Sequence, residues 1–175
     1  DEDYKLNYML KIKNKNSDNF LNNNKLSNPF DYVMDLTEER EIRRKKVDII
    51  ETFNYLIGLD VIKNYAVKSY NYETDKTELN KLVVTLSTGG NIKIKIIEGV
   101  LPNGKKALVI WRTLSDDLII DNAVLSEFLI KNEVHLSDYH SIYINGDSFM
   151  EETSTMKVLQ IETVMKKEMF ETGGR

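Results

Sequence analysis

The residues from Val61 to Thr113 constrain the fold most, because they form a series of strand-like segments separated by turn signals. In Asn91–Glu98, isoleucines alternate with lysines, which predicts a strand with one buried face and one solvent-facing face. Lys106–Thr113 is largely apolar, and such a segment is expected near the centre of a sheet. Together with Leu79–Ser87 these segments predict an antiparallel meander, with turns at Thr88-Gly89-Gly90-Asn91 and Pro102-Asn103-Gly104.

Further strands are predicted on both sides of the meander. Their segments alternate apolar and polar side chains or are rich in β-branched and aromatic residues: Tyr4–Ile12, Phe30–Leu36, Val61–Tyr72, Ser141–Asn145 and Met156–Ile161. Glu73–Glu78 is polar and predicts a turn, and Asn14–Asn24 is rich in asparagine and predicts a loop.

Three helices complete the expected fold. Val47–Val61 predicts an amphipathic helix on which the sheet packs, and Gly58 suits the positive φ of a helix end. Asp121 is the predicted N-cap of a second helix that ends near Asn132, and Glu162–Glu171 predicts a third, short helix. We therefore expect an α+β fold, with a largely antiparallel mixed sheet of about six or seven strands and two or three packed helices.

The length and composition limit the function. The 175 residues suit one domain, in which residues 1–46 hold N-terminal strands and a charged loop and residues 47–171 form the core. The 24 basic and 28 acidic residues give a net charge of -4, which disfavours nucleic-acid binding by the whole surface but permits a local basic patch. The absence of cysteine excludes disulfides and thiolate metal sites and fits a cytoplasmic location. No apolar run is long enough to span a bilayer, so no membrane partner is expected. The sequence begins at Asp1 without a methionine, which favours a piece of a longer protein.

Thr37–Lys46 carries a dense charge run, whose basic members are Arg40, Arg43, Arg44, Lys45 and Lys46. One interpretation is a patch that contacts DNA phosphates. The other is a solvated hairpin or helix lead-in, in which glutamates neutralise the run at helical spacing, Glu39 with Arg43 and Glu41 with Lys45. The second interpretation is favoured for the isolated chain, and DNA contact is kept as a hypothesis for an intact enzyme.

Candidates for metal binding are few. His135 and His140 are the only histidines, and Asp138 lies between them, but this spacing matches no standard metal site. The sequence shows no phosphate-binding glycine loop and no Ser-His-Asp constellation. A metal site is therefore disfavoured.

Two further groups have a structural and a functional interpretation. Glu98, Lys105 and Lys106 are the residue types of a metal-dependent nuclease, but their spacing is generic. Trp111-Arg112 closes the apolar strand, either as a core tryptophan with an arginine paired to a carboxylate, or as an interface or DNA contact. A nuclease site is therefore disfavoured, and the core interpretation is favoured for Trp111-Arg112.

Four segments, in their order and spacing, resemble the C-terminal region of the modification subunits of type III restriction-modification systems. They are NPFDYVMDL followed by VDIIETFNYLIGLDV; IEGVLPNGKKALVIWRT; SIYINGDS; and IETVMKKEMFE. The resemblance covers about Tyr4 to Glu171, and ETFNYL, VIWR and NGD taken together make it fairly specific. The motif residues to which it gives a structural role are Glu51, Thr52, Phe53, Asn54, Gly58, Trp111, Arg112, Asn145, Gly146 and Asp147.

The family consists of S-adenosylmethionine-dependent DNA adenine-N6 methyltransferases. Its catalytic tetrapeptide, Asp-Pro-Pro-Tyr, is absent because Pro29 and Pro102 are the only prolines, and its Phe-x-Gly-x-Gly cofactor loop is absent as well. The resemblance therefore implies a non-catalytic C-terminal accessory domain with no cofactor of its own, whose parent enzyme uses S-adenosylmethionine. Such a domain would support assembly of a homodimer, DNA holding or docking of the restriction subunit, beside the methyltransferase domain of the same chain. The alternative is a free-standing protein-interaction module without methyltransferase activity.

Overall fold

Strand β7 (Lys106–Arg112) lies at the centre of the main sheet, as its apolar sequence predicts. Ala107 to Trp111 are all 0 % exposed, so both faces of this strand are covered. β7 pairs antiparallel with β6 (Ile92–Val100) across the predicted turn, and it pairs in parallel with β8 (Ser141–Ile144).

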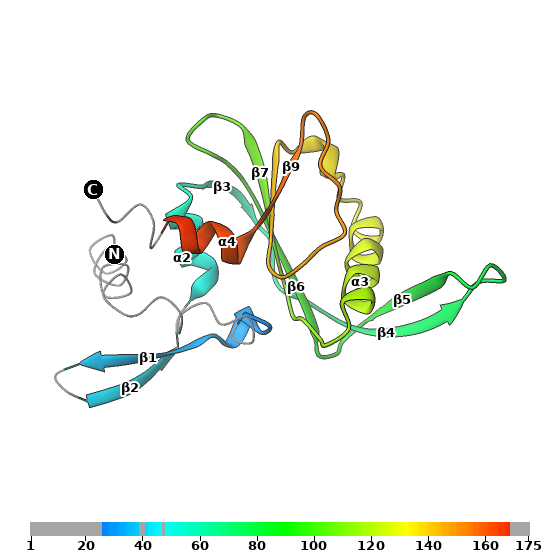
Figure 1. The fold of residues 1–175 in the computed structure, drawn as a ribbon, viewed down its shortest axis with the longest axis horizontal. Coiled ribbons are helices and arrows are strands. Elements are labelled where there is room, and N and C mark those ends of the chain that lie inside the picture. The colour runs from blue at the N-terminus through cyan, green and yellow to red at the C-terminus, as the bar shows by residue number, and fades with distance from the viewer. Residues whose placement is uncertain (1–25, 39–40, 47, 169–175) are drawn as a thin grey trace.

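The computed structural model describes residues 26–38, 41–46 and 48–168, so the strand predicted at Tyr4–Ile12 and the loop at Asn14–Asn24 lie outside the described residues. Within them the main sheet has seven strands, in the order β5-β4-β6-β7-β8-β9 with β3 also beside β6 (Figure 1). The sheet is mixed and mostly antiparallel, and with three α-helices it forms the predicted α+β fold. The other strands are β3 (Asp60–Asn64), β4 (Lys68–Lys76), β5 (Leu82–Thr88) and β9 (Lys157–Gln160).

β4 lies between β5 and β6, so the predicted meander is wrong at its first pair. Lys68–Tyr70 pairs with β6, whereas Tyr70–Lys76 pairs with β5. Most of Glu73–Glu78, predicted as a turn, therefore belongs to a strand, and β4 and β5 extend from the sheet as a two-stranded arm (Figure 1). Residues 73–76 of β4 were not predicted as a strand, because they are exposed on both faces and show no alternation of apolar and polar residues.

The predicted hairpin turn at Thr88–Asn91 instead carries the chain from β5 to β6 around β4. A Cβ atom at Gly90 would collide with the backbone carbonyl oxygen of Tyr70. The glycine is needed because two backbones approach closely, and a sequence shows that need only as a turn signal.

Helices cover both faces of the main sheet. α2 (Ile49–Leu56) and α4 (Ile161–Lys166) contribute to an apolar cluster on one face, and α3 (Leu118–Lys131) contributes to a second cluster on the other. β7 supplies alternate residues to both clusters: Ala107, Val109 and Trp111 to the first, and Leu108 and Ile110 to the second. The central strand thus connects two separate cores.

Asp48 caps the N-terminus of α2, and the helix is shorter than the predicted Val47–Val61 segment. The Asp48 carboxylate accepts a hydrogen bond from the Glu51 N–H at 3.0 Å, which satisfies a donor of the first turn. Gly58 follows the helix with a φ of +66°, as predicted for a helix end.

Phe53 attaches α2 to the sheet. Its side chain is 0 % exposed, and its ring meets Trp111 and Tyr143 edge-on, with centroid separations of 5.7 and 5.5 Å. Leu56 is partly buried against the same cluster. The sequence also predicts that Phe53, Leu56, Ile110 and Trp111 are buried together, and this prediction is wrong for Ile110. Ile110 lies in the opposite cluster because it alternates with Trp111 along β7.

α3 begins earlier than predicted. Asp117 is its N-cap and accepts hydrogen bonds from the N–H groups of Ile119 and Ile120 at 3.0 and 3.1 Å. Asp121 accepts hydrogen bonds from Ser115 instead, so its prediction as the N-cap is wrong. Both aspartates precede apolar residues, and the pattern alone does not separate them. The predicted end near Asn132 is confirmed.

A separate two-stranded sheet lies near α2 in the chain. It pairs β1 (Val33–Glu38) with β2 (Glu41–Lys46) in antiparallel register and follows the 3-10 helix η2 (Pro29–Asp31). The strand predicted at Phe30–Leu36 therefore starts three residues later. A second 3-10 helix, η3 (Leu136–Asp138), precedes β8. None of the helices in the described ranges is long and apolar enough to cross a membrane.

We predict that Phe53→Ala lowers the free energy of unfolding by about 3–5 kcal/mol, because the cavity beside Trp111 cannot fully collapse. Urea denaturation measures this change. Ile62→Ala, at a position that is 53 % exposed, is the control and should change stability by about 0.5 kcal/mol or less. Equal effects of the two substitutions would contradict the role of Phe53.

Candidate functional site

Motif residues from distant segments meet where β7 and β8 end. The Arg112 guanidinium lies against the turn after β8, where Nε donates to the carbonyl oxygen of Asn145 at 3.2 Å and Nη2 to that of Asp147 at 2.7 Å. The sequence segments VIWRT and SIYINGDS are therefore joined directly in the fold.

Asn145 completes this connection with its side chain, which is 0 % exposed. Nδ2 donates to the carbonyl oxygens of Arg112 and Leu26 at 2.9 and 3.1 Å, and Oδ1 accepts from the Arg112 N–H at 3.0 Å. A buried amide requires such partners, and here they continue the β7–β8 pairing beyond the last residue of β8. The same amide holds the N-terminal part of the chain at Leu26.

Gly146 allows a sharp turn between these partners. Its φ of +74° lies in the left-handed region, and a Cβ atom there would lie 2.6 Å from a methyl carbon of Leu114. Its N–H donates to Oε1 of Glu162 in α4 at 2.8 Å. The Asp147 carboxylate accepts a hydrogen bond from the Gln160 side chain at 3.0 Å. We call Arg112, Asn145, Gly146, Asp147 and Glu162 the polar centre.

Two opposite charges are buried in the polar centre. Arg112 is 2 % exposed and Glu162 is 7 % exposed. Burial lowers the pKa of Arg112, which Asp121, Glu162 and Asp147 counteract. Burial raises the pKa of Glu162 above its ordinary value, although backbone hydrogen bonds and Arg112 oppose the shift. Among the described residues, Arg112 Nη1 and Glu162 Oε2 have no hydrogen-bond partner, and an unsatisfied buried group costs about 1–3 kcal/mol.

The ETFNYL motif lies on the face of β7 from which the Trp111 side chain points. Phe53 packs on Trp111, the Thr52 hydroxyl donates to the Asp48 carbonyl oxygen at 2.8 Å, and the Asn54 carbonyl oxygen accepts from the Leu59 N–H at 2.9 Å. These contacts pack, cap and end α2. The residues of this motif therefore hold the fold, as do those of the polar centre.

The basic run lies on a strand instead of a helix. Arg43, Arg44, Lys45 and Lys46 belong to β2, and Arg40 lies outside the described residues. The helical pairing of Glu41 with Lys45 is wrong, because four residues along a strand span about 13 Å. The predicted pair of Glu39 with Arg43 includes a residue outside the described ranges. In the β1–β2 register, Asp35 lies opposite Arg44, so the run belongs to a hairpin, one of the two structures in the favoured interpretation.

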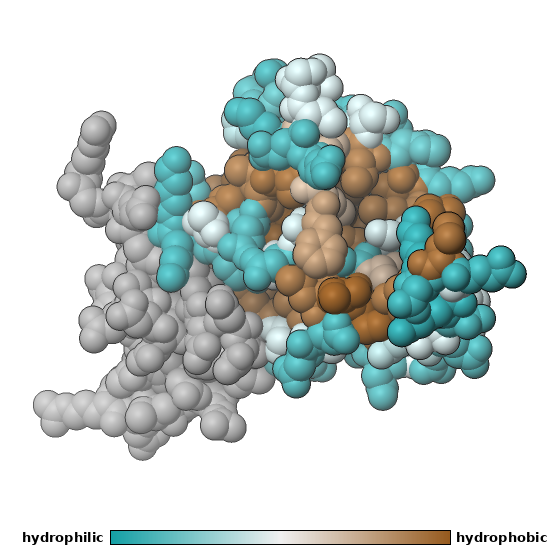
Figure 2. Space-filling model, turned by 45° about the vertical axis from the view of Figure 1, so that its right-hand side comes forward, coloured by the Kyte–Doolittle hydropathy of each residue, from teal (hydrophilic) through white to brown (hydrophobic). Residues whose placement is uncertain are grey.

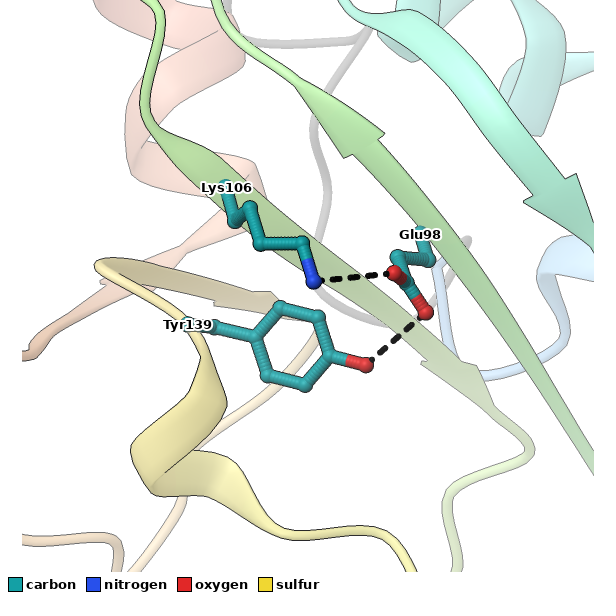
Figure 3. Close-up of polar contacts among 3 residues, drawn as sticks. All are labelled: Glu98, Lys106 and Tyr139. Carbon is teal, nitrogen blue, oxygen red and sulfur yellow. Dashed lines mark hydrogen bonds and ion pairs between the residues drawn. The ribbon is translucent and has the colours of Figure 1, made fainter.

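Glu98, Lys106 and Tyr139 form a small surface group on neighbouring elements (Figure 3). Lys106 Nζ lies 3.5 Å from Glu98 Oε1, and the Tyr139 hydroxyl donates to Glu98 Oε2 at 3.1 Å. Burial and the hydrogen bond to Glu98 raise the pKa of Tyr139, so its hydroxyl remains a donor at neutral pH. Both carboxylate oxygens thus have partners within the fold. Tyr139 was missed from sequence because one tyrosine in a loop has no pattern.

Lys105 lies apart from this group, with Nζ 3.3 Å from Nε2 of His140. Burial and the charges of Lys105 and Lys157 lower the pKa of His140. In the described part of the chain no three histidine or acidic residues are grouped as metal ligands. His135, Asp138 and His140 are therefore not grouped as metal ligands in the part of the chain that the structure describes. Lys105 contacts His140, whereas Lys106 contacts Glu98.

Comparisons with known proteins add no relative. No family model matches the chain, and no curated protein or solved structure does.

We predict that Glu162→Gln removes a pH-dependent part of the stability. Because the folded protein retains the Glu162 proton to higher pH than the unfolded chain does, the free energy of unfolding falls as the pH rises from 4.5 through the raised pKa. Glutamine keeps an acceptor for the Gly146 N–H but cannot ionise. The variant should therefore gain stability relative to the natural sequence across this pH range, as measured by urea denaturation.

Glu78→Gln is the matched control, since Glu78 is exposed at the end of the β4–β5 arm. Its free energy of unfolding should differ from that of the natural sequence by about 0.5 kcal/mol or less, because an exposed side chain makes few contacts. The same behaviour in Glu162→Gln would show that the buried carboxylate does not carry the effect.

Proposed function

We propose that this chain is a non-catalytic, cytoplasmic C-terminal accessory domain of an S-adenosylmethionine-dependent DNA adenine-N6 methyltransferase of the type III restriction-modification kind. The supporting observation is where the motif residues lie: Phe53, Trp111, Arg112 and Asn145 are at most 2 % exposed. Side chains so buried serve the interior of a fold and are not available to bind a substrate. Segments that resemble the family because they build the interior of the fold support a common architecture with it. Catalysis requires the Asp-Pro-Pro-Tyr tetrapeptide and the cofactor loop, which this sequence lacks.

The exposed features suit a domain that holds partners. The β1–β2 hairpin carries the basic run, and the β4–β5 arm extends beyond the helices on another side of the sheet (Figure 1). Apolar side chains also reach the surface between hydrophilic ones (Figure 2). Among the residues whose burial the structure describes, the large apolar side chains that are more than half exposed are Ile62, Leu79, Ile119, Ile130 and Phe149. Exposed apolar residues beside projecting strands favour contact with the methyltransferase domain, a second copy or the restriction subunit.

The first test is calorimetric titration of this chain with S-adenosylmethionine. We expect no heat of binding and no methyl transfer to DNA, because neither the cofactor loop nor the catalytic tetrapeptide is in the sequence. A micromolar dissociation constant, equivalent to about -8 kcal/mol, would contradict the proposal.

The second test replaces Arg43, Arg44, Lys45 and Lys46 by serine in the intact methyltransferase. If β2 contacts phosphates, DNA affinity should fall for all sequences, and the salt dependence should lose a slope of about 1 for each lost contact. The control removes four exposed lysines elsewhere, Lys63, Lys76, Lys81 and Lys167. Equal DNA affinity of the two variants at low and moderate salt would exclude the basic run as a phosphate contact and leave protein docking as the role of this hairpin.

A further inference from the structure

The dipeptide Asn-Gly occurs twice in the sequence, at Asn103-Gly104 and at Asn145-Gly146. Asparagine is chemically least stable in this context, because the following amide nitrogen attacks its side chain and glycine has no Cβ atom to obstruct the attack. The two copies lie in opposite surroundings. Asn103 is exposed in the turn between β6 and β7, which projects from one end of the sheet (Figure 1), whereas Asn145 is 0 % exposed in the polar centre.

The reaction at such a dipeptide requires only water and a base. At Asn103, the Gly104 nitrogen loses its proton and attacks Cγ of the asparagine, so that an N–Cγ bond forms, the Cγ–Nδ2 bond breaks and Nδ2 leaves as ammonia. Water then opens the resulting five-membered succinimide at either of its two carbonyl carbons. One opening gives aspartate, and the other gives isoaspartate, in which the backbone runs through Cγ. No oxidant or reductant takes part.

Two exposed hydrogen bonds hold Asn103 and its neighbour in the folded turn. The Gly104 N–H donates to the Leu101 carbonyl oxygen at 2.8 Å, and Asn103 Oδ1 accepts from the Lys105 N–H at 3.0 Å. A Cβ atom at Gly104 would meet no atom beyond its chain neighbours within 4 Å, so the space beside the glycine is open. Loss of these two bonds frees the attacking nitrogen and the side-chain amide while β6 and β7 stay paired. Such a local opening costs far less free energy than unfolding of the whole domain.

Asn145 has the same neighbour in sequence but is held on every side. Its side-chain amide makes three hydrogen bonds to the backbone of Arg112 and Leu26, which fix the position of its Cγ atom. The attacking group is held as well, because the Gly146 N–H donates to Glu162 at 2.8 Å. These bonds join β7, α4 and the turn after β8, so their release requires that the centre of the domain comes apart.

We propose that Asn103 is a site of spontaneous deamidation in the folded protein, and that the polar centre protects Asn145 from the same reaction until the domain unfolds. At position 103 the product fits the turn, because an aspartate keeps the acceptor for the Lys105 N–H. At position 145 an aspartate has no donor for the carbonyl oxygens of Arg112 and Leu26 and places a buried carboxylate against them. Unfolding that lasts until Asn145 reacts therefore becomes irreversible. The proposal is independent of the methyltransferase assignment.

Peptide mapping by mass spectrometry tests the proposal on the unaltered chain. The protein is incubated in mildly alkaline heavy-oxygen water, either folded or in urea, and each asparagine is followed for the label that succinimide hydrolysis introduces. Folding should slow Asn103 by about tenfold at most and Asn145 by about a hundredfold or more, because only global unfolding releases Asn145. Asn80 is the internal control, since it is exposed in the Thr77–Lys81 loop but precedes a lysine, and it should react far more slowly than Asn103. Equal labelling of Asn103 and Asn80, or equal protection of Asn103 and Asn145, would overturn the proposal.

Refolding tests the different consequences at the two positions. Chains that have partly reacted in urea are diluted, and native chains are separated from aggregates by size-exclusion chromatography. The native fraction should contain modified Asn103 but lack modified Asn145. The variants Asn103→Asp and Asn145→Asp provide the same comparison without incubation: the first should keep the urea midpoint of the natural sequence, and the second should lower it or abolish the transition. Modified Asn145 at equal abundance in both fractions would overturn the proposed irreversibility.

Discussion

The side-chain amide of Asn145 is the interaction on which the arrangement of distant segments depends. It bonds to the backbone of Arg112 in both directions and to Leu26, and so joins the end of β7, the end of β8 and the N-terminal part of the chain. On either side of the same turn, Arg112 donates to carbonyl oxygens and Glu162 accepts from an N–H. The turn after β8 is therefore held by Arg112 of β7 and by Glu162 of α4. An apolar residue at position 145 would leave buried backbone groups unpaired.

The sequence predicted those elements whose signals are local. The apolar run of β7 showed that it is central, the turn at Pro102–Gly104 showed that it pairs with β6, and Gly58 showed where α2 ends. The position of β4 was missed because strand pairing depends on distant partners and because a solvated arm shows no apolar alternation. Asp117 and Asp121 both resemble caps, and tertiary contacts decide between them.

The candidate site was only partly predictable for a related reason. Trp111 was interpreted as a core residue and Arg112 as paired to a carboxylate. Both side chains are buried, but the described hydrogen bonds of the guanidinium go to the backbone carbonyl oxygens of Asn145 and Asp147. No spacing rule indicates that Glu162 of α4 and Arg112 of β7 bind the same turn after β8. The two residues come from different elements and approach the turn from opposite faces of the sheet. Residues that pack around a turn look like a functional motif in sequence. Their burial in the structure distinguishes them from residues that contact a ligand.

The β4–β5 arm has a practical consequence for protein engineering. No third strand among those described pairs with its outer part, which is largely exposed, and the loop at its end, Thr77–Lys81, closes on itself through local hydrogen bonds. Additional residues inserted there would leave both apolar clusters and the polar centre untouched. The end of the arm is consequently the natural place to insert an affinity tag, a fluorophore or a whole reporter domain without disturbing either core.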